Sequence, residues 1–337
     1  MTIPKIFTLD DINKVISTPE FELKLIDAMQ TGFVSLENGD FFACPIQTMG
    51  LPPFPFVEID GYASQTCVKS GYFKGGKYYV IKVASGGFPQ ENSGLMQVFS
   101  QQTGKLEALL LDNGILTEVR TAAVGALSTK LLAPREITCI GIIGTGIQAR
   151  FQLGMLASVT SCRKVRVWGR SEDKAKVFQQ EMRAKGWEVA VVKKADELFD
   201  ECNLIVTTTC AREPVLGEAA LDKLKDRKYG LHITCIGADA PGKIELDPNL
   251  VAQADLLVAD TVSQSVERGE YEQAVKDGLV QESKIVPLGK FIGSPEEHRK
   301  QDDVRLTIFD SSGVALQDCI VAQMTYDALK DLKYMVN

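Results

Sequence analysis

Residues 141–149 read Gly-Ile-Ile-Gly-Thr-Gly-Ile-Gln-Ala and close the apolar run of residues 137–143. The pattern predicts a strand, a tight glycine turn and the start of a helix, with the spacing G-x-G-x-x-A. A second strand, predicted at 165–168, follows at the distance expected of a dinucleotide-binding fold. We expect the helix N-terminus to hold a pyrophosphate, with Gly144 allowing the turn and Gly146 the close approach of the backbone.

Strand and helix patterns alternate along residues 135–310. The alternation predicts a Rossmann-type α/β fold, a doubly wound parallel sheet with helices on both faces. The expected strands lie at 137–143, 165–168, 188–192, 204–208, 232–237 and 256–259. A further strand at 304–309 and a helix from 313 to 333 close the chain.

The first part of the chain reads as α+β. Thr18 and Pro19 predict a helix start, because Thr suits the N-cap and Pro the first helical position. Strands are expected at 66–73, 77–83, 94–99 and 106–111, followed by a helix at 117–132. We expect residues 1–128 together with 313–337 to form one domain, and residues 129–312 to form the Rossmann domain.

Composition narrows the class of protein. The 337 residues carry a formal net charge of −7 and are 45% hydrophobic, which suits ordinary globular cores. No apolar stretch approaches the ~20 residues of a membrane span, the N-terminus lacks a signal-peptide core, and no basic block suggests nucleic acid. We therefore expect a cytoplasmic protein with neither a membrane nor a nucleic-acid partner.

Cysteine and histidine usage points away from metal chemistry. None of the eight cysteines is spaced C-x-x-C, and there are only two histidines, His232 and His298. A zinc site or a histidine-based triad has little to draw on. We expect no metal site, and acid–base chemistry from Asp, Glu or Lys.

The residues at the end of the strand predicted at 165–168 indicate which nicotinamide cofactor binds. An NAD site usually has an acidic residue there to bind the ribose 2′-hydroxyl. This strand ends with Gly169, Arg170 and Ser171 instead. Because a guanidinium suits a 2′-phosphate, we favour NADP(H) as the cofactor. If Arg170 is only a solvated loop residue, NAD(H) is the alternative.

Three further stretches carry candidate chemistry. Lys82 stands inside an apolar strand pattern, where an ammonium needs an anion. Arg120 shares a helix face with Thr117 in an Ala-rich segment and also seeks a carboxylate or phosphate. Asp239 follows a strand at the edge where open α/β sheets bind ligands. Each could instead make a local ion pair or a turn cap.

Together with the glycine turn, these stretches resemble the ornithine cyclodeaminase/mu-crystallin family over essentially the whole chain. The resemblance rests on the segments LTEVRTAA (116–123), GADAPGKIEL (237–246) and DSSG (310–313). It implies a nicotinamide-dependent enzyme that acts on amino or imino groups. It also implies a homodimer whose subunit has a substrate and dimerisation domain and a Rossmann domain.

The resemblance also implies roles for single residues. Lys82 and Arg120 match the cations that bind the substrate α-carboxylate, and Asp239 matches the acid–base residue. Lys243 and Ser312 match residues that line the substrate. The expected cofactor-binding residues are Arg120, Thr121, Gly144, Gly146, Ile147, Gln148, Arg170, Ser171, Thr209 and Ile236.

The chain departs from the ornithine-cyclising members at Lys69, at Gln47, where they carry an arginine, and at Gly169, where they carry the ribose-binding aspartate. Those members place a carboxylate thirteen residues before the carboxylate-binding lysine, to hold the distal amino group of ornithine. Here that position is Lys69, which would repel an ammonium and attract an acidic side chain. A one-residue shift in strand register would turn Lys69 to the opposite face.

These observations favour NAD(P)H-dependent reduction of an α-imino acid to an L-amino acid, or the reverse oxidative deamination. Lys69 would bind a second acidic group, and iminosuccinate, which gives aspartate, is the best-matching substrate. One alternative is an ornithine cyclodeaminase, which converts L-ornithine to L-proline and ammonia while recycling NAD. The other is a mu-crystallin-like NADPH-binding protein with ketimine reductase activity.

Overall fold

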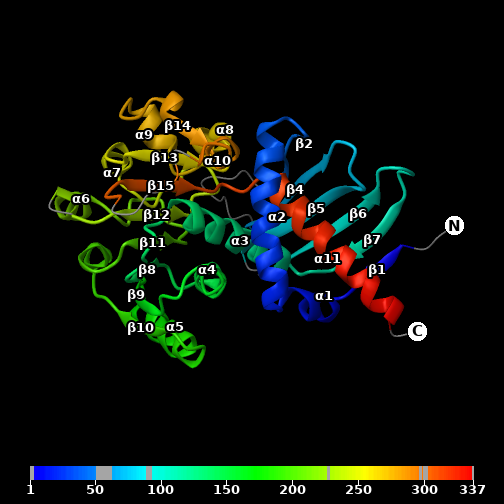
Figure 1. Cartoon of the computed structure of the whole chain (residues 1–337), viewed down its shortest axis with the longest axis horizontal. Coiled ribbons are helices and arrows are strands. Elements are labelled where there is room, and N and C mark those ends of the chain that lie inside the picture. The colour runs from blue at the N-terminus through cyan, green and yellow to red at the C-terminus, as the bar shows by residue number, and fades with distance from the viewer. Residues whose placement is uncertain are drawn as a thin grey trace. The chain divides into compact units, whose positions relative to one another are not determined.

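The structure is a computed structural model that describes residues 4–50, 63–88, 93–225, 228–295, 298 and 303–335. It forms two compact units (Figure 1), one made of Met1–Ala123 with Val314–Asn337 and the other of Val124–Gly313. The division falls within helix α3, Ile115–Leu132. In the described part of the chain, no helix combines the length and apolar character that a membrane crossing requires.

The first unit is built on a largely antiparallel sheet. Its strands run in the order β1-β7-β6-β5-β4-β2, with β3 also paired to β4. Strands β4 and β5 are long because they pair over ten consecutive positions, from Ala63 opposite Phe88 to Tyr72 opposite Tyr79. The strands are β1 (Lys5–Phe7), β2 (Phe41–Ala43), β3 (Gln47–Gly50), β4 (Ala63–Phe73), β5 (Tyr78–Phe88), β6 (Ser93–Ser100) and β7 (Leu106–Leu110).

Helices α1 (Leu9–Ile16), α2 (Pro19–Glu37) and α11 (Ala315–Met335) complete this unit. Thr18 caps α2 by accepting from the N–H of Phe21 at 3.2 Å, which confirms the predicted start. Helix α11 packs on β4, β5 and β6 and against α2, on one face of the sheet (Figure 1). Gly32 lets α2 approach α11 closely, since a Cβ there would clash with the side chain of Ile320.

The second unit is the predicted doubly wound fold. Its eight parallel strands run in the order β10-β9-β8-β11-β12-β15-β13-β14, so the chain reverses direction across the sheet at β8 and β11. Ligands of such sheets bind at this switch point, beyond the carboxyl ends of the strands. The strands are β8 (Ile140–Ile143), β9 (Lys164–Trp168), β10 (Glu188–Val191), β11 (Leu204–Thr207), β12 (Leu231–Cys235), β13 (Leu256–Ala259), β14 (Ile285–Pro287) and β15 (Leu306–Asp310).

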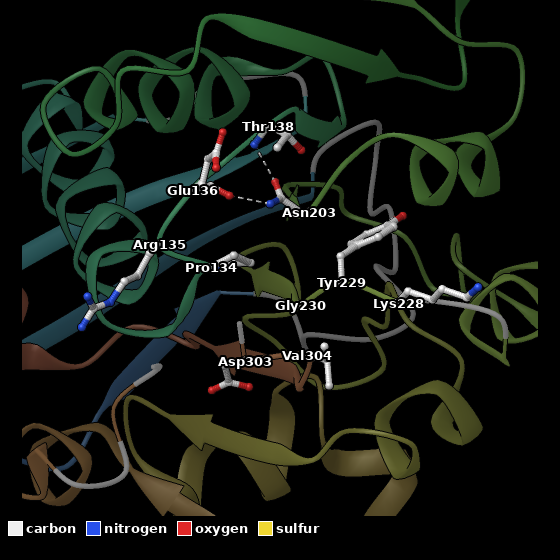
Figure 2. A pocket seen from close by; sticks show the side chains of 10 residues that line it. All are labelled: Pro134, Arg135, Glu136, Thr138, Asn203, Lys228, Tyr229, Gly230, Asp303 and Val304. Atoms are coloured by element: carbon white, nitrogen blue, oxygen red, sulfur yellow. Dashed lines mark hydrogen bonds between the residues drawn. The ribbon is translucent and has the colours of Figure 1, made fainter. Parts of the chain in front are cut away.

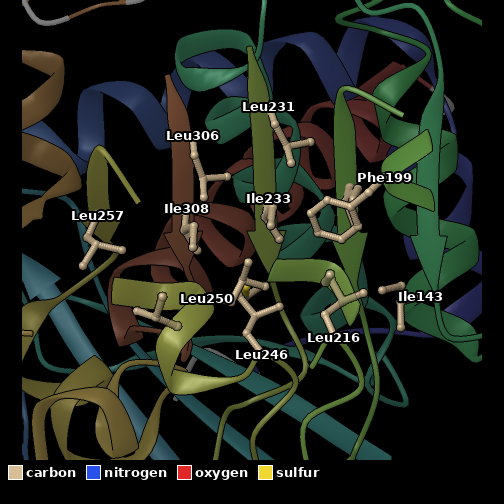
Figure 3. Close-up of a cluster of buried hydrophobic side chains, with 14 of the residues drawn as sticks. Ile143, Phe199, Leu216, Leu231, Ile233, Leu246, Leu250, Leu257, Leu306 and Ile308 are labelled. Carbon is tan, nitrogen blue, oxygen red and sulfur yellow. The ribbon is translucent and has the colours of Figure 1, made fainter. Parts of the chain in front are cut away.

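Both faces of this sheet are buried, as the helices on either side require. In β11, Ile205 joins one apolar cluster, while Leu204 and Val206 join the other. Figure 3 shows the first cluster, in which Leu231, Ile233 and their neighbours from parallel strands pack together. The α-helices are α4 (Ile147–Leu156), α5 (Glu172–Ala184), α6 (Glu218–Lys225), α7 (Pro248–Ala252), α8 (Val262–Arg268), α9 (Glu272–Lys276) and α10 (Leu288–Ile292), with short 3-10 turns at Ala195–Asp200 and Glu282–Lys284.

The predicted strands are found, with shifted ends. The first strand of the nucleotide fold begins at Ile140 rather than residue 137, and the last helix begins at Ala315 rather than 313. Strands β1, β2, β3 and β14 were not predicted, because three or four residues give too short a pattern.

Candidate functional site

The turn after β8 has a backbone that favours glycine. Gly144 has φ +110°, and a Cβ at this position would lie 2.6 Å from Oγ1 of Thr208. A side chain is therefore opposed both by the backbone conformation and by the neighbouring segment. The turn itself requires the first glycine of the predicted fingerprint.

Helix α4 begins with open space beside its first turn. Its N-cap is Gly146, where a Cβ would meet no heavy atom of the described residues within 4 Å. The first N–H groups of a helix lack partners within the helix, so this space suits a phosphate. Arg150 fixes the turn by donating from Nη1 to the carbonyl oxygens of Thr145 (2.6 Å) and Gly146 (3.0 Å). These residues fit the pyrophosphate of a dinucleotide.

The two residues after Gly146 start the helix. Ile147 is exposed, and the side-chain oxygen of Gln148 accepts from Nε2 of Gln152 at 3.2 Å. Thr209 and Ile236 follow the ends of β11 and β12, at the same edge of the sheet as the glycine turn. The expected cofactor residues of this unit thus gather at the carboxyl edge of the sheet.

The end of β9 is where a ribose-binding acid would stand. A Cβ on Gly169 would lie 2.7 Å from Cγ2 of Thr145, so Gly169 packs against the glycine turn. Arg170 is exposed, and Ser171 caps α5 by accepting from the N–H of Lys174 at 3.4 Å. An acidic side chain at 169 would collide with Thr145, which leaves Arg170 as the charged group at this strand end.

In the first unit, Lys69 and Lys82 are direct partners across β4 and β5. Paired residues of an antiparallel ladder project from the same face. Both side chains are buried, Lys69 at 9% and Lys82 at 4% exposure. The two lysines therefore share a face, as the interpretation of Lys69 required.

Helix α11 supplies the carboxylate that these cations face. Oδ1 of Asp318 lies 3.0 Å from Nζ of Lys82 and 3.1 Å from Nε of Arg120. Arg120 also donates from Nη1 to Oε1 of Gln317. Thr121, next along α3, donates its hydroxyl to the carbonyl oxygen of Thr117 at 2.8 Å. The anion that Lys82 and Arg120 were predicted to need is thus present within the chain, 236 residues from Lys82 in sequence.

Burial and charge compete at this cluster. Burial raises the pKa of Asp318, and the positive charges of Lys82, Arg120 and Lys69 lower it. The charges have the larger effect, so the pKa of Asp318 lies below its ordinary value. Burial lowers the pKa of Lys82, and Arg120 adds to that effect while Asp318 opposes it. Asp318 is therefore ionised, and it stabilises the charged form of the lysine beside it.

In the second unit, Asp239 and Lys243 form an ion pair beyond β12. Oδ1 of Asp239 lies 2.6 Å from Nζ of Lys243, and the Asp239 side chain is 54% exposed. The Asp239 carboxylate is therefore accessible to solvent and to a ligand at this edge of the sheet. Ser312 lies elsewhere at the same edge, buried, with its hydroxyl 3.4 Å from Oδ1 of Asp260.

A cavity of about 570 Å³ opens at the opposite edge of this sheet (Figure 2). It is lined by residues that precede strands, among them Thr138 before β8, Asn203 before β11 and Gly230 before β12. The Asn203 amide is already bonded there, donating to the Glu136 carbonyl oxygen at 2.7 Å and accepting from the N–H of Thr138 at 3.0 Å. This cavity lies at the amino ends of the strands, away from the edge where such sheets bind ligands.

The sequence patterns do not predict several buried polar residues near the candidate sites. Gln317 and Asp318 interrupt the apolar run of α11, and that interruption is the signal that could have identified them. Glu245 and Glu270 are buried acids near the carboxyl edge of the second sheet. Glu245 stands inside the predicted 237–246 motif, whereas nothing in the local sequence distinguishes Glu270.

The family model described as the ornithine cyclodeaminase/mu-crystallin family matches residues 13–333. A Sinorhizobium fredii protein named an uncharacterized cyclodeaminase is 32% identical over 322 residues, covering 93% of this chain and 95% of its own. The iminosuccinate reductase of Paracoccus denitrificans is 34% identical over 269 residues, covering 77% of this chain and 81% of its own.

Two solved structures extend the likeness to the fold. The iminosuccinate reductase of Paracoccus denitrificans in complex with NAD+ has a TM-score of 0.82 and 28% identity, covering 98% of this chain and 97% of its own. An archaeal alanine dehydrogenase dimer with bound NAD has the same TM-score at 26% identity, with the same coverage. The predicted fold class and family are confirmed. The chain belongs to the ornithine cyclodeaminase/mu-crystallin family.

Proposed function

We propose that this protein reduces an α-imino acid to an L-amino acid with a nicotinamide cofactor, or runs the reverse oxidative deamination. We further propose that the substrate carries a second carboxylate, as iminosuccinate does. The observation that supports this choice is that three buried basic side chains, Lys69, Lys82 and Arg120, converge on the carboxylate of Asp318 in the described part of the first unit.

The charge balance of the cluster favours an acidic ligand. Among the residues that the structure describes, three basic side chains act on Asp318, so a bound dianion would add negative charge to a cluster rich in cations. Asp112 is also buried and lies near Lys82; burial raises its pKa, and its Oδ2 accepts from the N–H of Leu116 at 3.0 Å at the start of α3. Cations held in a water-poor site interact with carboxylates far more strongly than cations in bulk water do.

The proposed reaction assigns one task to each side chain. The nicotinamide cofactor, when bound, supplies a hydride to the imine carbon. Lys82 and Arg120 hold the α-carboxylate and withdraw electron density from that carbon. Asp239 passes a proton to the nitrogen, and Lys69 binds the second carboxylate. Hydride and proton together convert the C=N bond to CH–NH.

The similarity to iminosuccinate reductase, at 34% identity, supports the reaction class. The similarity to an alanine dehydrogenase supports a nicotinamide cofactor and leaves the side chain of the substrate open. Ornithine cyclisation is the weaker candidate, because Lys69 lies directly opposite Lys82 and would repel a distal ammonium.

The first experiment mixes the purified protein with NADH or NADPH, excess ammonia and a 2-oxo acid, and follows the nicotinamide absorbance. Oxaloacetate, which forms iminosuccinate with ammonia, is compared with pyruvate and glyoxylate. We expect oxaloacetate to be used best. Faster turnover of pyruvate would contradict the role of Lys69. Ammonia release from L-ornithine with NAD, and without net NADH, would show that the cyclodeaminase alternative is correct.

The variant Lys69→Met tests the second carboxylate directly. A charge-assisted bond of about 3 kcal/mol corresponds to about 100-fold in kcat/KM for oxaloacetate with ammonia. The kcat/KM for pyruvate should change little, because its imine has one carboxylate. Lys74→Met is the matched control, since Lys74 is exposed in the turn between β4 and β5. Equal losses of kcat/KM for both substrates would show that Lys69 does not bind the second carboxylate of the substrate.

A further inference from the structure

Three buried acids form a chain near the carboxyl edge of the second sheet. Asp310, Glu270 and Glu245 are each at most 1% exposed. Asp310 accepts from the backbone N–H of Glu270 at 3.2 Å, and Glu270 accepts from the N–H of Glu245 at 3.0 Å and of Leu246 at 2.6 Å. Each carboxylate therefore fixes the backbone of the next acid, and the chain ends at the side chain of Glu245.

Glu245 holds the ends of two adjacent strands. Its Oε2 accepts from Oγ1 of Thr207 at 2.6 Å and from the N–H of Gly237 at 2.9 Å. Its Oε1 accepts from the N–H of Thr209 at 2.5 Å. Thr207 ends β11, and Gly237 follows the neighbouring strand β12. One carboxylate thus joins the two strand ends.

Both strand ends lead to residues of the candidate site. Thr208, between two of the groups that Glu245 holds, donates its N–H to the carbonyl oxygen of Ile143 at 2.8 Å and lies against Gly144. On the other strand, the N–H of Asp239 donates to the carbonyl oxygen of Gly237 at 3.2 Å. The glycine turn therefore contacts Thr208, which stands between two residues bound by Glu245. The Asp239 segment is joined by one hydrogen bond to Gly237, which Glu245 also binds.

We propose that Glu245 is a positioning residue that sets the cofactor crevice by fixing the backbone of Thr209 and Gly237. It touches neither the predicted pyrophosphate site nor Asp239 itself, and it acts through the segments that carry them. The effect on turnover rests on the proposed function, whereas the effect on cofactor binding does not.

The contacts of Glu245 require a carboxylate rather than an amide. Both of its oxygens accept from backbone N–H groups, which can only donate. In a Glu245→Gln variant, either orientation of the amide would direct an NH2 group at the N–H of Thr209 or of Gly237. A buried donor facing a donor loses its hydrogen bond and its solvation together.

Glu270 offers a matched control. Its Oε1 accepts from the N–H groups of Glu245 at 3.0 Å and Leu246 at 2.6 Å, and its Oε2 shares the N–H of Glu245 at 3.1 Å. An amide with its oxygen at the Oε1 position therefore keeps an acceptor for both N–H groups, which no orientation of an amide does at Glu245. Burial raises the pKa of Glu270 well above its ordinary value, and the charge of Glu245 raises it further. Burial also raises the pKa of Glu245, but the hydrogen bonds from Thr207, Thr209 and Gly237 oppose that rise.

The test is a fluorescence titration of NADH and NADPH into the purified protein without substrate. We expect Glu245→Gln to weaken binding of the preferred cofactor about tenfold or more, and Glu270→Gln to change it less than about twofold. Circular dichroism and the thermal midpoint are measured on both variants. Equal cofactor affinity in the two variants would overturn the proposal, as would a wild-type protein that binds neither cofactor.

A second pair of variants serves if Glu245→Gln fails to fold. Thr207→Val removes one donor to Glu245 while keeping the shape of the side chain, and Thr207→Ser keeps the hydroxyl. We expect Thr207→Val to weaken cofactor binding about threefold to fivefold and Thr207→Ser to leave it near wild type. If the two variants bind alike, the positioning role is wrong. If binding follows the prediction while no imino acid is reduced, only the proposed reaction fails.

Discussion

At the scale of single residues, Asp318 explains how three cations tolerate burial together. Unpaired lysines in an apolar interior lose their charge, because desolvation favours the neutral amine. The carboxylate of Asp318, 3.0 Å from Lys82 and 3.1 Å from Arg120, offsets part of that effect. The side chains of the cluster are therefore in place before any ligand arrives, which reduces the reorganisation that binding requires.

Asp318→Asn should destabilise the protein in a pH-dependent way. Because the folded-state pKa of Asp318 is below its ordinary value, its ionisation stabilises the fold above pH ~4, and that stabilisation is lost as pH falls through the folded pKa. We expect urea unfolding at pH 7 to show a loss of about 3–5 kcal/mol, as when one partner of a buried ion pair is removed. The difference between wild type and variant should shrink as the pH falls below 4.

The control for this prediction is Asp40→Asn, an exposed acid at the end of α2. Surface substitutions of this kind change unfolding free energy by about 0.5 kcal/mol or less. A destabilisation by Asp318→Asn that is independent of pH would show that packing, and not charge, is what the aspartate contributes.

Arg170→Ser tests the cofactor preference at the same scale. A guanidinium bonded to a 2′-phosphate contributes about 1.5–3 kcal/mol, so we expect the Kd for NADPH to rise about 10- to 100-fold. The Kd for NADH should stay within about twofold, because NADH lacks that phosphate. Measured by the same titration, equal changes for both cofactors would contradict 2′-phosphate recognition by Arg170.

At the scale of elements, what the sequence could predict depended on how local the signal was. The β8–turn–α4 unit was predictable, because Gly144, Gly146 and the flanking apolar runs lie within a few residues of one another. The Lys82–Asp318 pair was not, since its members are 236 residues apart and only the packing of α11 on the first sheet joins them. The same holds for Glu270, which reaches Glu245 across 25 residues and several loops.

The glycine turn permits a prediction that separates folding from binding. Gly146→Ala should leave the thermal midpoint near wild type, because φ at Gly146 is −83° and a Cβ there has open space. That Cβ would occupy the space proposed for the pyrophosphate, so cofactor affinity should fall about tenfold or more. Gly144→Ala should instead destabilise the fold by about 1–3 kcal/mol, because its φ of +110° is strained for alanine.

Gly154→Ala is the control within the same helix. A Cβ at 154 also meets no heavy atom of the described residues within 4 Å, but the position is inside α4 and away from the turn. Alanine there should raise stability by about 0.5–1 kcal/mol and leave cofactor affinity unchanged. If Gly146→Ala behaves like Gly154→Ala in the titration, the phosphate site is not at this helix N-terminus.

At the scale of the whole molecule, the two units differ in how many faces of their sheets are covered by helices. The second unit covers both faces of its parallel sheet with helices, whereas α2 and α11 of the first unit lie on one face of its sheet (Figure 1). On the other face, Phe42, Tyr72 and Tyr79 form a row of aromatic side chains with ring centroids 5.4 Å and 5.1 Å apart. Phe42 is 47% and Tyr79 37% exposed.

Exposed aromatic side chains on a sheet face are typical of protein–protein contacts. We expect the protein to form a homodimer through this face, in keeping with the alanine dehydrogenase dimer among the similar structures. Tyr79→Glu would place a charge among the three aromatic rings and should convert the dimer to monomer at micromolar concentration, as measured by light scattering after size-exclusion chromatography. Leu23→Glu is the control, because Leu23 is 50% exposed on α2, on the helix-covered side. A monomer produced by Leu23→Glu and not by Tyr79→Glu would move the interface to the helix layer, and the aromatic row would then need another explanation.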